Sequence, residues 1–328
     1  MASISNQERP SKNDTIWNEE DRISNLPDPI LVHILSFLPT KYAVGTSILS
    51  SRWKHLWASI PNLDFDYDSL LNRRRGYADE LSFMSFVDRV LRLHNLSYIR
   101  RFCLIFLHGE IDLCRLNTWI NVAMSRSLQE LDIQISLYGN LGLPSKLFTC
   151  ETLVIFKLFS EVALFDIPDS VSFPSLKILH ISLFNPSYKL TEKLFRGCPV
   201  LEDLFIVANM EYNSQRIFNI YAPAMKSFKI DLFGSSENKI MLNAPRLEYL
   251  TILIAPKLEY LNLQDNYLAS YFLDNLSSLV KADVNVGHCC IQTRATKEYA
   301  NQVFVLLKEI YNVKSLSLSA RTMRALDF

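Results

Sequence analysis

The sequence predicts an α/β protein in which a short three-helix module is followed by a solenoid with a parallel sheet on its concave side. Residues 23–65 are dense in apolar residues and in residues that begin and end helices. From residue 99 onward the pattern L-x-x-L-x-L recurs, with other apolar residues substituting. We therefore expect a disordered tail at 1–22, the module at 23–65, a linker and first solenoid helix at 66–98, and repeats at 99–328.

The composition excludes several classes of partner. Among 328 residues, 34 Lys and Arg balance 34 Asp and Glu, so no long-range field attracts nucleic acid or an anionic membrane. The N-terminus lacks the apolar core of a secretory signal, and no apolar run approaches the roughly 20 residues that span a bilayer. We expect a soluble protein of the cytoplasm or nucleus with no nucleic-acid or membrane partner, whose six cysteines stay reduced.

Three short helices are predicted in the module. Asp28 is a candidate cap for a helix that Pro39 ends, because proline cannot continue a helix. Thr40 is a candidate cap for a second helix and Ser51 for a third. So small a bundle buries too little apolar surface to be stable alone, so we expect it to lean on a neighbour or a partner.

The module resembles the F-box in its common plant form. The matching segments are Leu26-Pro27-Asp28, Ile34 to Pro39, Thr40-Lys41, Ser47 to Ser50 and Arg52 to Trp57. The resemblance implies docking to a Skp-family adaptor, which joins F-box proteins to the cullin and RING subunits of SCF-type ubiquitin ligases. Residues that match the adaptor-facing or core positions of the motif are Leu26, Pro27, Ile30, Ile34, Leu35, Leu38, Pro39, Val44, Leu49, Trp53 and Trp57.

Some of these residues have a second explanation. Packing within the helical bundle explains the apolar side chains at Val44, Leu49 and Trp57 as well as adaptor docking does. Leu26 and Pro27 lie ahead of the helices, which favours the docking interpretation for them.

The second part of the chain has the spacing of leucine-rich repeats. Successive motif starts lie mostly 21 to 29 residues apart, and each motif ends in the alternation of a strand. The starts at Leu247 and Leu258 are only eleven apart, which predicts a loop or a tight bend at one of them. Val313 follows Leu279 by 34 residues, and apolar periodicity predicts a helix over 294–310 in that gap and another over 82–93.

Phrases such as 194–204 and 242–248 look like the repeats of plant F-box/leucine-rich-repeat proteins. With the F-box, this resemblance covers most of the chain. It implies a substrate-recognition subunit that serves ubiquitin-dependent protein degradation. Relatives of this architecture often continue into a further C-terminal domain, and we see no pattern for one after the last motif.

The concave face of the sheet is the predicted target-binding surface. Side chains alternate along a strand, so the residues between the core leucines face outward. A mixed polar surface with aromatic residues suits a protein target, although any single residue is more readily explained as a solvated one. The candidates are Asp132, Lys157, His180, Asp203, Phe205, Lys229, Tyr249, Tyr260 and Asn262.

No pattern for catalysis, cofactor binding or metal binding is found. Eight glycines form no phosphate-binding loop, and no nucleophile elbow or spaced ligand pair occurs. His288-Cys289-Cys290 fits a packed turn better than a metal site, and Arg73 to Arg75 fit a solvated loop. We therefore predict a non-enzymatic adaptor without a cofactor. The alternatives are a scaffold or a small-molecule co-receptor without a degradation target.

Overall fold

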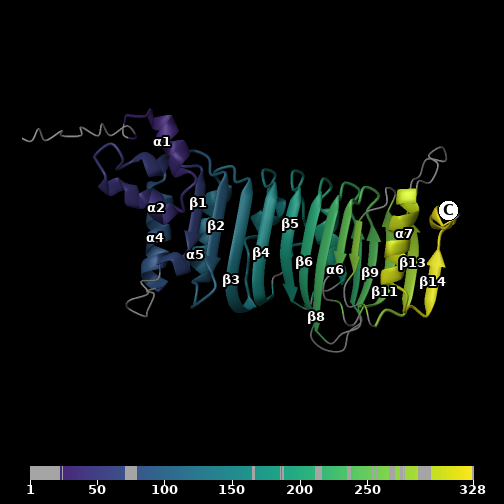
Figure 1. Cartoon of the computed structure of the whole chain (residues 1–328). Coiled ribbons are helices and arrows are strands. Elements are labelled where there is room, and N and C mark those ends of the chain that lie inside the picture. The colour runs from purple at the N-terminus through teal and green to yellow at the C-terminus, as the bar shows by residue number, and fades with distance from the viewer. Residues whose placement is uncertain are drawn as a thin grey trace, which may run out of the picture.

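The computed structural model of the 328-residue chain describes residues 23, 25–70, 80–164, 167–184, 186, 188–210, 216–234, 238–252, 255, 258–265, 270–273, 276, 278–286 and 297–326. The predicted tail at 1–22, the arginine run at 73–75 and the His-Cys-Cys segment at 288–290 lie outside the described residues. The described elements form an elongated solenoid with the N-terminal module (residues 23–65) at one end and the C-terminus at the other (Figure 1).

The N-terminal module contains two short α-helices and two 3₁₀ turns: α1 (Asp28–Leu35), α2 (Thr40–Gly45), η1 (Thr46–Ile48) and η2 (Leu56–Ser59). Pro27 and Pro39 occupy the N-cap positions, so Asp28 and Thr40 are the first helical residues and not caps. The segment predicted as a third helix forms turns and η2 instead. The corrections at Asp28 and Thr40 have one cause, since each follows a proline and the helix begins directly after that proline.

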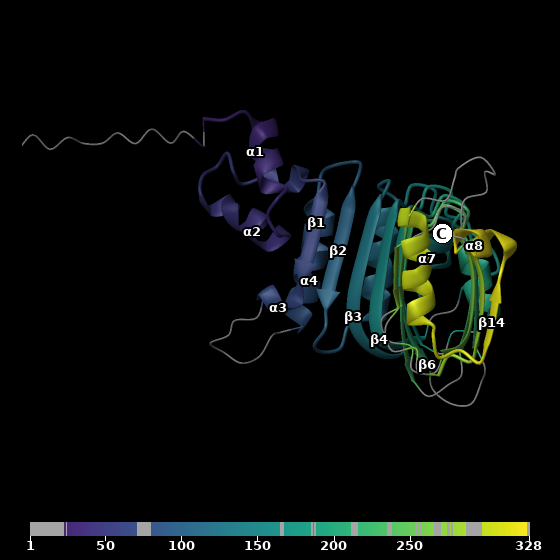
Figure 2. The same ribbon diagram turned by 45° about the vertical axis from the view of Figure 1, so that its right-hand side comes forward.

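The first sheet has nine parallel strands in the order β1-β2-β3-β4-β5-β6-β8-β10-β12. Each strand pairs with its neighbours in a parallel register, as the repeat pattern predicts (Figures 1 and 2). The bounds are β1 (Asn62–Asp66), β2 (Arg101–Phe106), β3 (Glu130–Asn140), β4 (Ile155–Leu164), β5 (Ile178–Phe184), β6 (Asp203–Met210), β8 (Ser227–Gly234), β10 (Tyr249–Ile252) and β12 (Ser270–Leu273).

The other side of the solenoid changes from helices to strands along its length. Behind the earlier strands lie α3 (Tyr67–Leu70), α4 (Glu80–Leu93), α5 (Leu113–Met124), η3 (Ser145–Thr149) and α6 (Tyr188–Arg196). Behind the later ones lies a second, five-stranded sheet in the order β14-β13-β11-β9-β7. Its strands are β7 (Arg216–Tyr221), β9 (Asn238–Asn243), β11 (Leu258–Asp265), β13 (Lys281–Val286) and β14 (Ser315–Leu318).

The second sheet explains the irregular motif spacing. Leu247 and Leu258 lead into β10 and β11, which lie in different sheets, so one coil of the solenoid carries two strand motifs. Neither motif is a loop. The long gap before Val313 contains α7 (Lys297–Glu309), which confirms the predicted helix, and α4 likewise confirms the helix predicted over 82–93.

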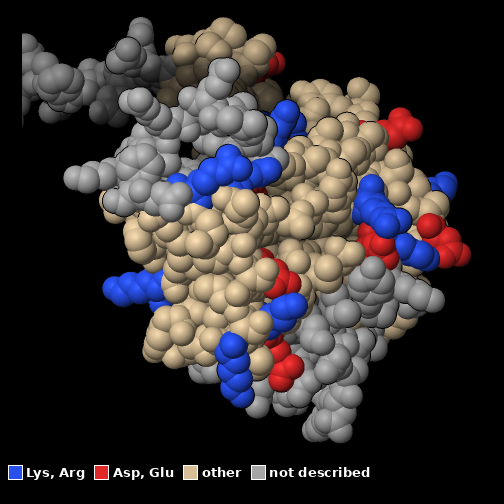
Figure 3. Space-filling view, turned by 90° about the vertical axis from the view of Figure 1, so that its right-hand side faces the viewer, with Lys and Arg blue, Asp and Glu red and all other residues tan. Residues whose placement is uncertain are grey.

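The C-terminal end of the first sheet is covered by α7, which packs against β12. A short helix, α8 (Ala320–Ala325), packs against β13, β14 and α7. The buried Thr322 hydroxyl accepts a hydrogen bond from the Val286 N–H at 3.0 Å and so ties α8 to the end of β13. Figure 3 shows charged side chains scattered around a broad uncharged surface at this end of the molecule.

The core lies between the two layers and runs the length of the solenoid. Inward positions hold side chains such as Phe102, Phe156 and Phe228 from the first sheet, and Phe218 from the second. Within the described residues, no helix is both long enough and apolar enough to cross a membrane.

Candidate functional site

The predicted adaptor-docking residues divide by exposure. Pro27, Ile30, Ile34, Pro39 and Leu49 are exposed on the N-terminal module. Three others are partly buried against the core, and three are fully buried. The partly buried ones are Leu26, Leu38 and Val44, and the buried ones are Leu35, Trp53 and Trp57.

Four large exposed apolar residues of the module were missing from the prediction: Ile23, Phe37, Tyr42 and Ile48. Ile48 is 90% exposed and Phe37 is 74% exposed, and Tyr42 also faces solvent. Two of them, Phe37 and Ile48, lie inside the matched F-box segments. The sequence signal for such an exposed residue is an apolar side chain that lies off the apolar face of a short helix. Phe37, Tyr42 and Ile48, with Ile30, Ile34 and Leu49, are the exposed apolar side chains of the module that we call the docking surface.

The helical part of the N-terminal module, residues 28–59, is bonded directly to β1 and to the segment after α4. Thr40 is fully buried, and its hydroxyl accepts a hydrogen bond from the N–H of Asp64 on β1 at 2.8 Å. The Asn95 N–H, just after α4, donates to the Ala58 carbonyl at 3.0 Å. Trp53 and Trp57 belong to the same continuous core as the first strands. The module therefore packs against the solenoid, which is its neighbour within the same chain.

His94 lies at the centre of this junction. Its Nε2 donates to the Ile60 carbonyl at 2.8 Å, and Arg126 donates to its Nδ1 at 3.0 Å. These two bonds fit a neutral ring with the proton on Nε2. Burial lowers the pKa of His94 and the neighbouring Arg126 lowers it further, against the opposing effect of the Ile60 bond.

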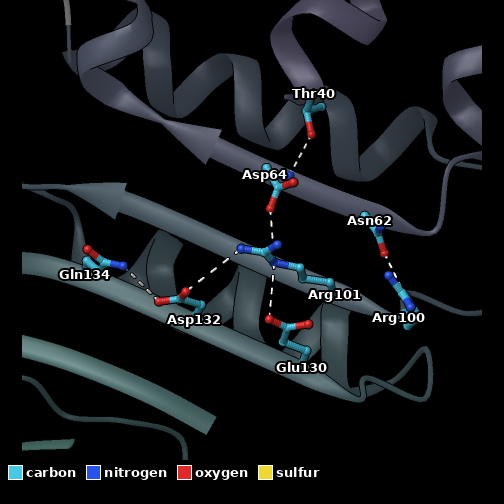
Figure 4. A network of polar contacts seen from close by, with 8 residues as sticks. All are labelled: Thr40, Asn62, Asp64, Arg100, Arg101, Glu130, Asp132 and Gln134. Atoms are coloured by element: carbon cyan, nitrogen blue, oxygen red, sulfur yellow. Dashed lines mark hydrogen bonds and ion pairs between the residues drawn. The ribbon is translucent and has the colours of Figure 1, made fainter. Parts of the chain in front are cut away.

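Arg101 lies among three carboxylates on the outer face of the first sheet (Figure 4). Its guanidinium is 3.3 Å from Asp64, 3.5 Å from Glu130 and 4.0 Å from Asp132. Burial raises the pKa of Asp64, although Arg101 opposes that shift. The group therefore links β1, β2 and β3 beside the bond to Thr40.

Cys103 lies beside the same carboxylates on β2. Burial, followed by the nearby Asp132 and Asp64, raises the pKa of its thiol to about 12. A thiol with so high a pKa stays protonated and is a poor nucleophile.

One row of side chains crosses the outer face of the first sheet from β1 to β12. Strand register places its members side by side, and most of the predicted target-binding residues belong to it. We call this the central row: Asp64, Cys103, Asp132, Lys157, His180, Phe205, Lys229, Thr251 and Phe272. Asp203 and Tyr249 lie two residues earlier on their strands and face the same side.

An aromatic group surrounds Phe205 in the middle of this row. The Phe205 ring lies 6.1 Å from Phe159 and 5.8 Å from His180 between ring centroids, and the Lys229 ammonium lies 4.5 Å from its centroid. His180 Nε2 is 3.2 Å from Asp203 Oδ1. Phe159 was missed, although it stands two residues after Lys157 and so faces the same side.

Three predicted target residues are placed differently from the expectation. Tyr260 and Asn262 lie on β11 of the second sheet and not on the concave face, because the short motif spacing moves that strand to the opposite layer. Asp132 faces the expected side but is buried beside Arg101. In the described part of the chain, no group of three or more His, Cys, Asp or Glu residues is placed to hold a metal ion.

Comparison with known proteins finds matches for both parts of the chain. A model of the F-box domain matches residues 23–65, and one described as FBD-associated F-box protein At5g56370, LRR repeats, matches 116–270. F-box/LRR-repeat protein At4g14103 of Arabidopsis thaliana is 35% identical, over 94% of this chain and 80% of that protein.

Two further Arabidopsis thaliana proteins are similar over nearly the whole chain. F-box/FBD/LRR-repeat protein At5g22700 is 34% identical, over 93% of this chain and 68% of its own length. F-box/LRR-repeat protein At4g14096 is 33% identical, over 94% of this chain and 64% of its own length. The similarity thus spans both the N-terminal module and the solenoid.

Proposed function

The chain belongs to the F-box/LRR-repeat protein family, and from that premise we propose that it is a substrate-recognition subunit of an SCF-type ubiquitin ligase. In this proposal the N-terminal module docks a Skp-family adaptor, and through it the cullin and RING subunits. The concave face of the first sheet holds a target protein. Proteins of this family are generally non-catalytic adaptors, and we place this activity in the cytoplasm or nucleus.

The docking surface is the observation that carries the proposal. Ile30, Ile34, Phe37, Ile48 and Leu49 are all more than 40% exposed, although the module as a whole is short. Scattered single apolar residues are ordinary, but several on one small module favour an interface. Burying these side chains against an adaptor would remove their apolar surface from water and so favour binding.

The proposed mechanism is proximity. Phe205 on β6 is five strand spacings from β1, or about 24 Å at about 4.8 Å per spacing. A target held there by a chain whose module is bonded to the sheet would stay at a set distance from the ubiquitin-charged enzyme. The effective concentration of its lysines would rise without any bond chemistry by this chain.

The aromatic group around Phe205 sets the kind of target that we propose. Phe159 and Phe205 offer ring surface, and Lys157, Lys229 and His180 offer donors beside it. Aromatic residues commonly supply the anchoring contacts of protein interfaces, while polar neighbours set the orientation. A protein segment with apolar and acidic side chains matches this chemistry.

The test is co-purification of the full chain with a Skp-family adaptor, followed by titration of the two. Ile48→Asp introduces a charge at a site that is 90% exposed, so the fold should tolerate it. We expect the adaptor affinity to fall by about tenfold or more, because the charge would have to be desolvated at the interface.

The matched control is Tyr311→Asp, which adds the same charge at another exposed residue, 76% exposed and beyond α7. It should bind the adaptor as the unchanged chain does. If the folded chain binds no adaptor paralogue, or if both variants lose the same affinity, the docking surface is not the adaptor site and the ligase proposal fails.

A further inference from the structure

An unassigned hollow lies on the outer face of the second sheet, opposite the proposed target surface. It forms where the helices of this layer give way to strands, between the end of α6 and the face of β7, β9 and β11. Its volume is about 780 Å³, within the range of about 300–1,000 Å³ typical of small-molecule sites. We call it the amide pocket, after the residues of its floor.

Neutral amide side chains form that floor. Asn219, Asn243, Asn262 and Gln264 alternate with inward core residues along their strands. Register places Asn243 beside Gln264, and Asn219 and Asn262 on either side of Met241. No hydrogen bond of the Asn243 or Gln264 side chains to another described residue occurs, so both offer donors and acceptors to a ligand.

Charge is nearly absent from the lining. Among the described residues that line the pocket there is no carboxylate, and Arg196 is the one cation. Arg196 is itself paired with Glu192 at 2.7 Å. A phosphate or carboxylate ligand would therefore lack the paired cations that usually bind such groups. A purely apolar ligand would leave the Asn243 and Gln264 amides without partners.

A chain of polar contacts orients one of the floor amides. The Asn262 amide donates to the Tyr260 hydroxyl at 3.2 Å, and that hydroxyl donates to Asp283 at 2.5 Å. Lys281 pairs with Asp283 at 3.3 Å and lies 5.1 Å from the centroid of the Tyr260 ring. The side-chain oxygen of Asn262, Oδ1, remains available as an acceptor, which suits a ligand that donates hydroxyl hydrogens.

We propose that the amide pocket binds a neutral oligosaccharide. Sugar hydroxyls both donate and accept, as the amides do, and the exposed Tyr221 ring and Met241 side chain offer apolar surface for the C–H faces of the sugar rings. Adjacent strands repeat at about 4.8 Å. A chain of sugar rings laid across the strands therefore meets a new side chain at roughly every ring.

A peptide fits these observations less well. Strand addition needs a free sheet edge, but β9 and β11 are paired on both sides. The outer edge of β7 has α6 against it. A peptide would be recognised through side chains alone, without main-chain pairing. The inference concerns the sheet opposite the proposed target surface and does not rest on the ligase proposal.

The experiment is calorimetric titration of the full chain with three neutral tetrasaccharides: cellotetraose, maltotetraose and chitotetraose. We expect at least one to bind. Gln264→Leu should weaken that binding by about tenfold, because it removes a hydrogen-bonding group of similar size from the pocket floor. The matched control is Asn285→Leu, which changes an amide in the same row, one strand beyond the lining.

Thermal unfolding first confirms that both variants are folded, as expected for outward-facing residues. Binding that Gln264→Leu weakens and Asn285→Leu leaves unchanged supports the pocket. Three results would overturn it: no heat with any of the three sugars, equal weakening in both variants, or binding only of a capped neutral Gly-Ser peptide run in parallel.

Discussion

At the scale of single residues, the junction between the module and the solenoid depends on a few buried or half-buried polar groups. Thr40, His94 and Arg126 each hold a bond that crosses between segments far apart in the chain. A buried donor or acceptor that loses its partner costs about 1–3 kcal/mol, so each bond constrains the position of the module. These contacts could not be read from the sequence, because each joins residues more than 20 positions apart.

His94 makes the stability of the chain depend on pH. Its pKa is lowered in the folded chain, so below about pH 6.5 the unfolded chain takes up a proton that the folded chain refuses. The contribution of neutral His94 to the free energy of unfolding is complete above about pH 6.5. It is lost as the pH falls toward the pKa of His94 in the folded chain. We expect the free energy of unfolding, measured with urea, to fall between pH 7.5 and pH 5.5, and to fall less in His94→Gln.

The control for this effect is His55→Gln, which removes an exposed histidine from the same module. It should keep the pH dependence of the unchanged chain. If His94→Gln and His55→Gln lose stability equally on acidification, His94 is not the residue responsible.

At the scale of elements, the repeat pattern predicted the first sheet well. A strand begins within every L-x-x-L-x-L motif, from the motif of β2 to the motif of β14. The pattern failed to predict β1, β7, β9 and β12, which carry no such motif. Local alternation at Phe218 and Ile220, and again at Ile240 and Leu242, was the available signal. Which sheet a strand joins depends on how the coils stack, and that is not a local property.

The helix α7 illustrates how an element protects the end of a sheet. It packs against β12, the last strand of the first sheet, and buries Val303 and Leu306 there. Leu306→Ala should lower the free energy of unfolding by about 2–5 kcal/mol, because it leaves a cavity in a fully buried site.

Phe304 on the same helix provides the comparison, since it is 55% exposed. Phe304→Ala should change the free energy of unfolding by less than about 1 kcal/mol in the same denaturation experiment. Similar losses in both variants would mean that α7 does not pack as described.

At the scale of the whole molecule, the two candidate surfaces lie on one continuous body. The docking surface is on the N-terminal module, and the aromatic group around Phe205 is on the middle strands of the first sheet (Figures 1 and 2). A single core joins them. The motif residues pointed to both surfaces, but exposure decided which of them are available, and exposure depends on packing between distant segments.

This continuity predicts that the module and the first strands open together. Thr40→Val leaves the half-buried Asp64 N–H without its acceptor and should cost about 1–3 kcal/mol. In hydrogen-exchange mass spectrometry, we expect residues 56–60 and β2 to lose protection by the same amount, because they belong to one cooperative unit. Loss confined to residues 40–60 would show instead that the module opens on its own. A target held on the sheet would then not stay at a set distance from the adaptor.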